Sequence, residues 1–336
     1  MMKVRCVHLF MQAVIGLMAV GCLAQHRYPE AKITLHVVNQ DGQPVSDTEI
    51  EACFWLNDED IRVFRKRPDK QGMVSFQSLT LAEVLFDNSR TVGRTVLPDQ
   101  KYYQTELKYR LQNYDESVKT GKWQPWNPTI EMVLKEKKKP IPMYATDRQN
   151  EKQIPLRNKW CGFDMEKNDW VAPHGSGNYA DIEVFIRWDG KIADQYTGAW
   201  LTIRFPDPEA GFYPFQLDAY SSFLSPYHAI TNEQYQKELN FPGRSVQRND
   251  VKDKKRFRSD IGYVFRTRTR VNSEGKVICA RYGKMYPPHV EMFYLWRGGK
   301  SFIFLPYYLN PTENDTNLES DPEKNLFKKF KYGTKP

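Results

Sequence analysis

The 336-residue sequence has few of the side chains from which metal and redox sites are built. It contains 6 histidines and 5 cysteines, and it has no Cys-x-x-Cys, His-Glu-x-x-His or His-x-His motif. Zinc ribbons, thioredoxin-like redox sites and zinc peptidases of the zincin type depend on such spacings. The sequence therefore predicts no metal site and no cofactor.

Beyond residue 22 the chain also lacks an apolar run long enough to span a bilayer, which takes about 20 residues. At the start, Lys3 and Arg5 precede a mostly apolar run over 7–20, and small residues follow it. This layout is typical of a secretory signal. We therefore predict that residues 1–24 are a signal peptide and that the protein is exported, to be periplasmic, secreted or lipid-anchored to the cell envelope.

Two cleavage sites are compatible with this signal. The Cys-Leu-Ala sequence at 22–24 suits an ordinary signal peptidase, which would leave Gln25 as the first residue. The Ala-Val-Gly-Cys sequence at 19–22 resembles a bacterial lipobox, in which Cys22 would be lipidated. In the second case the lipid anchor would be the protein's attachment to a membrane.

The positive charge of the chain is modest and dispersed. The formal net charge of +8 includes Lys3 and Arg5, which leave with the signal. The basic runs at 135–139, 252–258 and 328–331 lie far apart in the sequence and contain acidic or aromatic residues. Because nucleic-acid-binding proteins concentrate basic side chains on one face, we predict no nucleic-acid partner.

Amphipathic helix patterns are almost absent. The segment 231–239 is the best helix candidate, since Thr231 and Gln234 have the spacing of a capping box. Elsewhere, short alternating segments separated by Gly, Pro, Asn and Asp predict strands. The fold class is therefore predicted to be mainly β, with antiparallel β-sandwich domains over 32–137 and 156–310.

The first of these regions resembles a known module. The run "ITLHVVNQDGQPVSDTEIEACFW" at 33–55, followed by a turn at 69–72 and "GMVSF" at 72–76, is similar to the carboxypeptidase regulatory-like (transthyretin-like) domain. The resemblance covers residues 32–137. It implies a seven-stranded Greek-key β-sandwich of the kind that serves as an accessory or adhesion module.

Two further segments show no alternating pattern. Residues 138–155 are charged and contain prolines, which is typical of an extended linker between domains. Residues 311–336 are polar, and we expect them to form a tail over the surface of the second domain.

The stretch "DWVAPHGSGNYADIEVFI" at 169–186 contains an aspartate, a histidine, a Gly-Ser-Gly and a second aspartate. The spacing differs from the Gly-x-Ser-x-Gly elbow of acyl-transfer enzymes, and the glycines precede a strand. We therefore expect a tight turn into a buried strand and assign no catalytic residue. The alternative is a polysaccharide-modifying hydrolase of unfamiliar type that uses paired carboxylates such as Asp169 and Asp181.

Three arginines alternate within "VFRTRTRV" at 264–271. Because alternate side chains of a strand share a face, Arg266, Arg268 and Arg270 would stand in a row about 7 Å apart. An exposed row of guanidinium groups would bind an anionic ligand such as an acidic glycan. The alternative is that the arginines are neutralised by acidic neighbours.

The remaining cysteines allow one disulfide in an exported protein, and the pair considered is Cys161 with Cys279. Cys53 is interpreted as an ordinary strand residue.

Together these features favour an exported, non-catalytic cell-envelope protein with a binding or scaffolding role. A glycan is the most favoured ligand class, and an acidic glycan or another envelope component is the expected partner.

Overall fold

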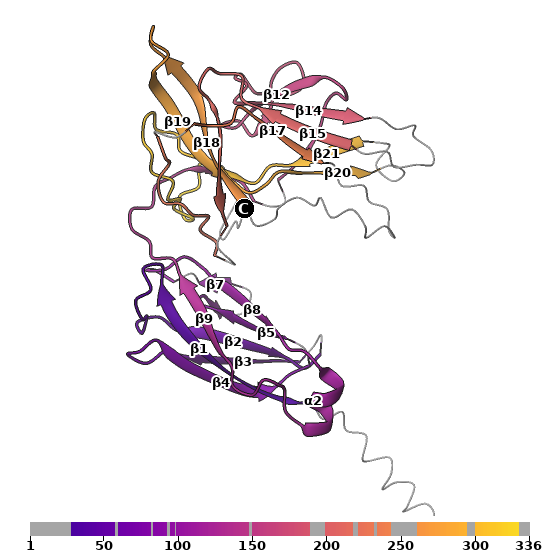
Figure 1. The fold of residues 1–336 in the computed structure, drawn as a ribbon, viewed down its shortest axis with the longest axis vertical. Coiled ribbons are helices and arrows are strands. Elements are labelled where there is room, and N and C mark those ends of the chain that lie inside the picture. The colour runs from indigo at the N-terminus through magenta and orange to yellow at the C-terminus, as the bar shows by residue number, and fades with distance from the viewer. Residues whose placement is uncertain are drawn as a thin grey trace, which may run out of the picture. The chain divides into compact units, whose positions relative to one another are not determined.

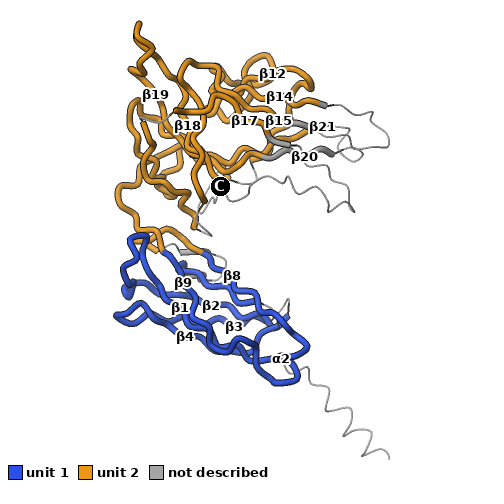
Figure 2. Tube along the Cα trace, viewed as in Figure 1, with its two compact units in different colours: residues 1–97, 106–133 blue, residues 98–105, 134–336 orange. Residues whose placement is uncertain are grey.

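The fold is mainly β, as predicted, and its sheets are antiparallel. The chain divides into two compact units, residues 1–97 with 106–133 and residues 98–105 with 134–336 (Figures 1 and 2). The predicted signal peptide, with Cys22, lies outside the residues that the computed structural model describes. The described residues are 28–57, 60–81, 83–92, 95–97, 99–147, 150–188, 199–217, 221–231, 234–242, 261–293 and 300–328.

Unit 1 contains two main sheets and a hairpin. A three-stranded sheet has the order β4-β1-β9, a four-stranded sheet has the order β3-β2-β5-β8, and β6 pairs with β7. The strands are β1 (Glu30–Asn39), β2 (Ile50–Trp55), β3 (Ile61–Lys66), β4 (Met73–Leu79), β5 (Glu83–Asp87), β6 (Arg90–Val92), β7 (Thr95–Leu97), β8 (Glu106–Arg110) and β9 (Thr129–Leu134).

The apolar residues of the alternating segments form the core between these two sheets. Ile33 and Leu35 of β1 and Phe54 of β2 have no exposed surface. Across the sheets, the rings of Phe76 on β4 and Phe86 on β5 lie 5.8 Å apart. Unit 1 is therefore a β-sandwich, because the apolar faces of both sheets are buried against each other. Its main sheets contain seven strands, the number that the family resemblance implies, and membership of that family stays a prediction.

The predicted turn at 69–72 has a clear stereochemical basis. The Asp69 carboxylate accepts hydrogen bonds from the backbone N–H groups of Gln71 and Met73, at 2.9 Å each. Gly72 follows with a φ of 77°, and a Cβ there would lie 2.4 Å from the carbonyl oxygen of Val37. Glycine is required at this position because the left-handed backbone and the close approach both exclude a side chain.

The helix of unit 1 lies where no helix was predicted. Helix α2 (Tyr114–Thr120) is placed at one end of the unit 1 strands (Figure 1). It has Asp115 and Glu116 in its first turn, Lys119 in its last turn and a left-handed Gly121 after it, which are favourable helix-end residues. No helix among the described residues is long and apolar enough to cross a membrane.

The prediction of a helix over 231–239 is wrong. The described residues of this segment, 231 and 234–239, are not helical. Gln236 forms a bridge with Phe212, and a strand begins at Glu238. In that strand Leu239 pairs with Ile203. The long-range pairing overrides the local capping pattern, as tertiary context commonly does.

Unit 2 is built from three sheets. Their strand orders are β10-β22-β19-β18-β16, β11-β21-β20 and β13-β12-β14-β15-β17. The strands are β10 (Tyr144–Ala145), β11 (Glu151–Gln153), β12 (Trp160–Asp164), β13 (Asp169–Trp170), β14 (Ile182–Trp188), β15 (Ala199–Arg204), β16 (Gly211–Gln216), β17 (Glu238–Pro242), β18 (Ile261–Val271), β19 (Val277–Met285), β20 (His289–Phe293), β21 (Lys300–Phe304) and β22 (Tyr307–Leu309).

The sheet that contains β18 is apolar on both faces. On one face the ring of Phe265 lies 5.9 Å from that of Phe205, the residue after β15, within the core between the sheets. On the other face Val264 joins a second buried cluster with Tyr282 and Tyr308. Because both faces are apolar, both must be covered.

The segments predicted to be a linker and a surface tail pack against this second apolar face, which corrects both predictions. Residues 138–155 contain strands β10 and β11, and Met143 is fully buried in the second cluster. Leu318, in the predicted tail at 311–336, is buried in the same cluster, and the Ile141 N–H donates to the Glu319 carbonyl at 2.8 Å. The described parts of both segments thus belong to the folded unit 2.

Candidate functional site

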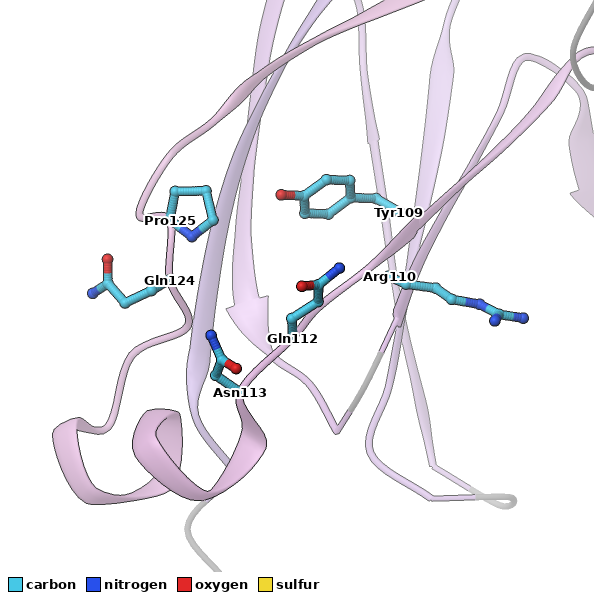
Figure 3. Close-up of a pocket in the computed structure, with 6 residues that line it drawn as sticks. All are labelled: Tyr109, Arg110, Gln112, Asn113, Gln124 and Pro125. Carbon is cyan, nitrogen blue, oxygen red and sulfur yellow. The ribbon is translucent and has the colours of Figure 1, made fainter.

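A hollow of about 580 Å³ opens in unit 1 beside α2. Strand β8 leads into the helix through 111–113, and the chain returns after the helix through 122–125. Gln112 forms an isolated antiparallel bridge with Gln124, which holds the two segments together. The hollow is lined by Tyr109, Arg110, Gln112, Asn113, Gln124 and Pro125 (Figure 3).

The two strand residues of the lining point in different directions, as alternation along β8 requires. The ring of Tyr109 extends across the hollow with its hydroxyl toward Pro125, whereas the side chain of Arg110 points away (Figure 3). The Arg110 Nε lies 3.9 Å from an Oε of Glu83. Tyr109 is therefore the aromatic surface of the site, and the guanidinium group lies outside it.

Three residues with primary amides line the hollow together with Tyr109. The side chains of Gln112, Asn113 and Gln124 are exposed, no hydrogen bond is found between any of these side chains and another described residue, and that of Asn113 does not cap α2. The Gln112 amide is directed toward Tyr109, while Gln124 projects outward from the rim (Figure 3). Each amide has two donor hydrogens and an acceptor oxygen, which are thus available to a ligand.

Asn113 has an unusual backbone that fixes its position. It precedes α2 with a φ of 61°, and its side chain does not cap the helix. Asparagine adopts this left-handed conformation more readily than most residues do. The conformation lets the chain turn sharply from β8 into α2 while the amide remains free of the helix.

The opposite wall is fixed by the core. Trp123 is almost fully buried, and its Nε1 donates to the Thr80 carbonyl at 3.0 Å. The Trp123 N–H donates to the Glu30 carbonyl at 2.9 Å, and the Glu30 N–H donates to the Gly121 carbonyl at 2.9 Å. The return segment is therefore tied to β1, so the hollow is largely preformed, as ligand sites usually are.

The lining is suited to binding. Its six residues include no carboxylate, histidine, serine or cysteine, which are among the usual groups for acid–base and nucleophilic catalysis. An aromatic ring offers a flat apolar surface, and the amides offer directional hydrogen bonds. The arrangement can recognise a flat polar ligand that has both apolar and hydroxyl- or amide-bearing edges.

The predicted row of exposed arginines is wrong. The pairing of β18 with β19 shifts register between Thr267 and Arg270, and Arg268 has a φ of 50°. Arg266 is only 6% exposed, and its guanidinium lies 4.4 Å from the Tyr235 ring centroid. The bulge breaks the alternation on which the row depends, so the three side chains do not share an exposed face.

Arg268 is instead neutralised by acids, the alternative that the sequence left open. Its guanidinium forms ion pairs with Asp164 at 3.2 Å, Glu166 at 2.7 Å and Asp181 at 2.8 Å. Burial raises the pKa of Asp181, and the hydrogen bonds from Arg268 oppose that rise. Arg270 is exposed and lies 3.3 Å from Glu313.

The Gly-Ser-Gly stretch forms the expected tight turn. The Asp169 carboxylate accepts hydrogen bonds from the N–H and Oγ of Ser176, at 2.9 and 2.8 Å. A Cβ on Gly175 would lie 2.4 Å from the Trp170 carbonyl oxygen. Asp169 is thus committed to the turn and Asp181 has no exposed surface, so neither is available as a member of an exposed carboxylate pair.

The disulfide considered between Cys161 and Cys279 is not formed in the structure. Cys161 and Cys279 are free thiols in β12 and β19, which belong to different sheets, and Cys53 is free as well.

Among the described residues, no group of three His, Cys, Asp or Glu side chains could hold a metal ion.

Sequence reasoning missed the hollow because its two walls are separated by a helix that was not predicted. The local signal was the pair of amides at Gln112 and Asn113 directly after a strand, and another amide before Pro125. These residues become a site only when the chain returns past α2.

Comparisons with known proteins identify no family. No protein-family model matches the chain, and no curated protein is significantly similar. A DUF3823 family protein from Parabacteroides merdae is 13% identical with a TM-score of 0.21, over 76% of this chain and 96% of that one. A streptococcal ancillary pilin is 14% identical with a TM-score of 0.21, over 65% and 60%.

A third solved structure is that of a candidate carbohydrate-binding protein from Bacteroides uniformis. It is 11% identical with a TM-score of 0.19, over 85% of this chain and 99% of that one. At these scores the three similarities carry no assignment of function.

Proposed function

We propose that this protein is an exported, non-catalytic cell-envelope protein that binds a glycan, and that the hollow in unit 1 is its binding site. The observation that carries the proposal is that the Tyr109 ring and the amides of Gln112 and Asn113 line one hollow, with the Gln112 amide toward the ring (Figure 3), and that the fold itself does not use these amides. Side-chain groups with unused hydrogen-bonding capacity in a preformed hollow are the usual mark of a ligand site.

The chemistry of a sugar ring fits this lining. One face of a pyranose presents C–H groups, which pack on an aromatic ring, and its edge presents hydroxyls that both donate and accept hydrogen bonds. Primary amides donate and accept in the same way. Arg110 is the one charged residue of the lining, and because its guanidinium points away (Figure 3), the site suits a neutral sugar unit better than an acidic one.

The predicted secretory signal at 1–24 supports an extracytoplasmic ligand. The resemblance of residues 32–137 to transthyretin-like modules supports an accessory role, since such modules usually bind rather than catalyse. No contact among the described residues favours the alternative, a hydrolase that uses Asp169 and Asp181.

The test is a glycan array probed with the mature protein, residues 25–336, followed by incubation with every glycan that binds. The proposal expects a defined set of neutral glycans to bind and to be recovered uncleaved. Cleavage of a bound glycan would favour the hydrolase. An array with no binder, neutral or acidic, would overturn the proposal.

A further inference from the structure

Strand β3 forms an unusually exposed edge of the four-stranded sheet in unit 1. It pairs with β2 and with no other described strand. All of its side chains except Phe64 are exposed, and two of them are apolar: Ile61 is 38% exposed and Val63 is 47% exposed. Edge strands with exposed β-branched residues are surfaces to which another strand can add.

The hydrogen-bond pattern shows which backbone groups face outward. The Leu56 N–H donates to the Asp60 carbonyl at 2.9 Å, and the same register continues into the β2–β3 pair. Hydrogen-bonded and non-hydrogen-bonded pairs alternate along an antiparallel ladder. Arg62, Phe64 and Lys66 therefore bond to β2, and the N–H and C=O groups of Ile61 and Val63 point to the free edge.

Those outward groups have no partner in the described part of the chain. No hydrogen bond joins the backbone of Ile61 or Val63 to any described residue beyond the β2 ladder. The edge thus offers a donor and an acceptor at each of two alternate residues. This spacing is the one that an added antiparallel strand requires.

The charge of the edge restricts the partner. Strand β3 contains Arg62, Arg65 and Lys66 and no acidic residue, and Arg67 follows it. Arg65 forms an ion pair with Glu51 at 2.7 Å. The exposed Arg62 forms no ion pair with any described residue. A second copy of this chain would bring an equally basic strand to the edge, which like-charge repulsion disfavours.

We propose that β3 binds an extended acidic segment of a partner protein, which adds to the sheet as a strand. Alternation sets the pattern of that segment. Its apolar residues would lie on the face of Ile61 and Val63, and its acidic residues would lie on the opposite face, opposite Arg62. Lys66 shares the face of Arg62, but its Nζ already donates to the Ser75 carbonyl at 2.7 Å. This protein-binding edge is separate from the hollow at Tyr109 and does not depend on the glycan proposal.

The test uses the mature protein and two labelled peptides, one alternating glutamate with valine and one alternating lysine with valine. Fluorescence anisotropy should show saturable binding of the glutamate peptide and at least about tenfold weaker binding of the lysine peptide. Hydrogen exchange at the amides of Ile61 and Val63 should slow when the glutamate peptide binds.

Val63→Pro removes one outward N–H without removing a bond to β2, and an edge strand tolerates proline at such a position. We expect it to weaken binding of the glutamate peptide at least about tenfold, with Val63→Thr, which keeps the N–H, as the matched control. Arg62→Glu, on an exposed side chain, should weaken binding similarly and should not alter the fold.

Equal binding of the two peptides, or full binding by Val63→Pro, would overturn the proposal. Concentration-dependent dimerisation that Val63→Pro abolishes, without peptide binding, would assign the edge to a second copy instead. Tyr109→Ala should leave peptide binding unchanged, so that failure at this edge is distinguishable from failure at the hollow.

Discussion

The guanidinium of Arg268 binds both carboxylate oxygens of Asp181, with Nε donating to Oδ1 at 2.8 Å and Nη2 donating to Oδ2 at 3.0 Å. Asp181 also accepts a hydrogen bond from the Met165 N–H at 2.8 Å and has no exposed surface. The pair joins β18 to the start of β14, and it explains why a bulged strand can hold an arginine with a left-handed backbone.

Arg268→Ala should destabilise unit 2 strongly. Removing one partner of a buried ion pair leaves the other charge uncompensated, which costs about 3–5 kcal/mol. Arg270→Ala is the matched control, because Arg270 is exposed and its loss should cost no more than about 0.5 kcal/mol. Urea unfolding of the two variants measures the difference, and equal losses would contradict the buried network.

The turn around Asp169 predicts an acid-sensitive contribution to stability. Burial raises the pKa of Asp169, but hydrogen bonds from Ser176 outweigh it and hold the pKa below its ordinary value of 3.8. A carboxyl with a lowered folded pKa stabilises the fold above its unfolded pKa, and this contribution is lost as pH falls through the folded pKa. Asp169→Asn should therefore be less stable than wild type at neutral pH.

That difference should shrink as pH falls below the ordinary carboxyl pKa of 3.8, because the wild-type carboxyl becomes protonated as pH falls through its lowered folded pKa. Chemical unfolding of both proteins at a series of pH values measures it. A difference that stays constant down to the acid limit would show that the carboxylate charge does not hold the turn.

Lys284 is a buried amine whose replacement should stabilise the protein. It has no exposed surface, its Nζ lies 3.6 Å from the Phe223 ring centroid, and burial lowers its pKa well below the ordinary value. Because the unfolded chain binds a proton more readily than the folded chain does, wild-type stability should rise as pH rises toward 10.5.

Lys284→Met keeps the length of the side chain and removes this penalty. It should raise the melting temperature at pH 7, and its advantage over wild type should narrow as pH rises. Lys276→Met, at an exposed position in a turn, is the control and should change stability by no more than about 0.5 kcal/mol. A destabilised Lys284→Met would show that the 3.3 Å bond from Nζ to the Pro226 carbonyl outweighs the cost of burial.

The alternating patterns that predicted strands such as β1 and β14 are local, so they could be read from the sequence. The bulge between Thr267 and Arg270 could not, because it arises from pairing with β19. The burial of Met143 and Leu318 depends on a sheet that is apolar on both faces, a property of its assembled strands. The hollow likewise depends on the bridge between Gln112 and Gln124 across a helix.

The central claim is that Tyr109 and its neighbouring amides bind a glycan, and titration of the strongest array glycan into three proteins tests it most directly. Tyr109→Ala should weaken binding at least about tenfold, equivalent to about 1.4 kcal/mol, through loss of the stacking surface. Lys108→Ala changes the adjacent, exposed residue of β8, which lies on the other face of the strand, and should bind as wild type does. Unchanged melting temperatures would show that both variants are folded. Equal glycan affinities for wild type and Tyr109→Ala would contradict the account.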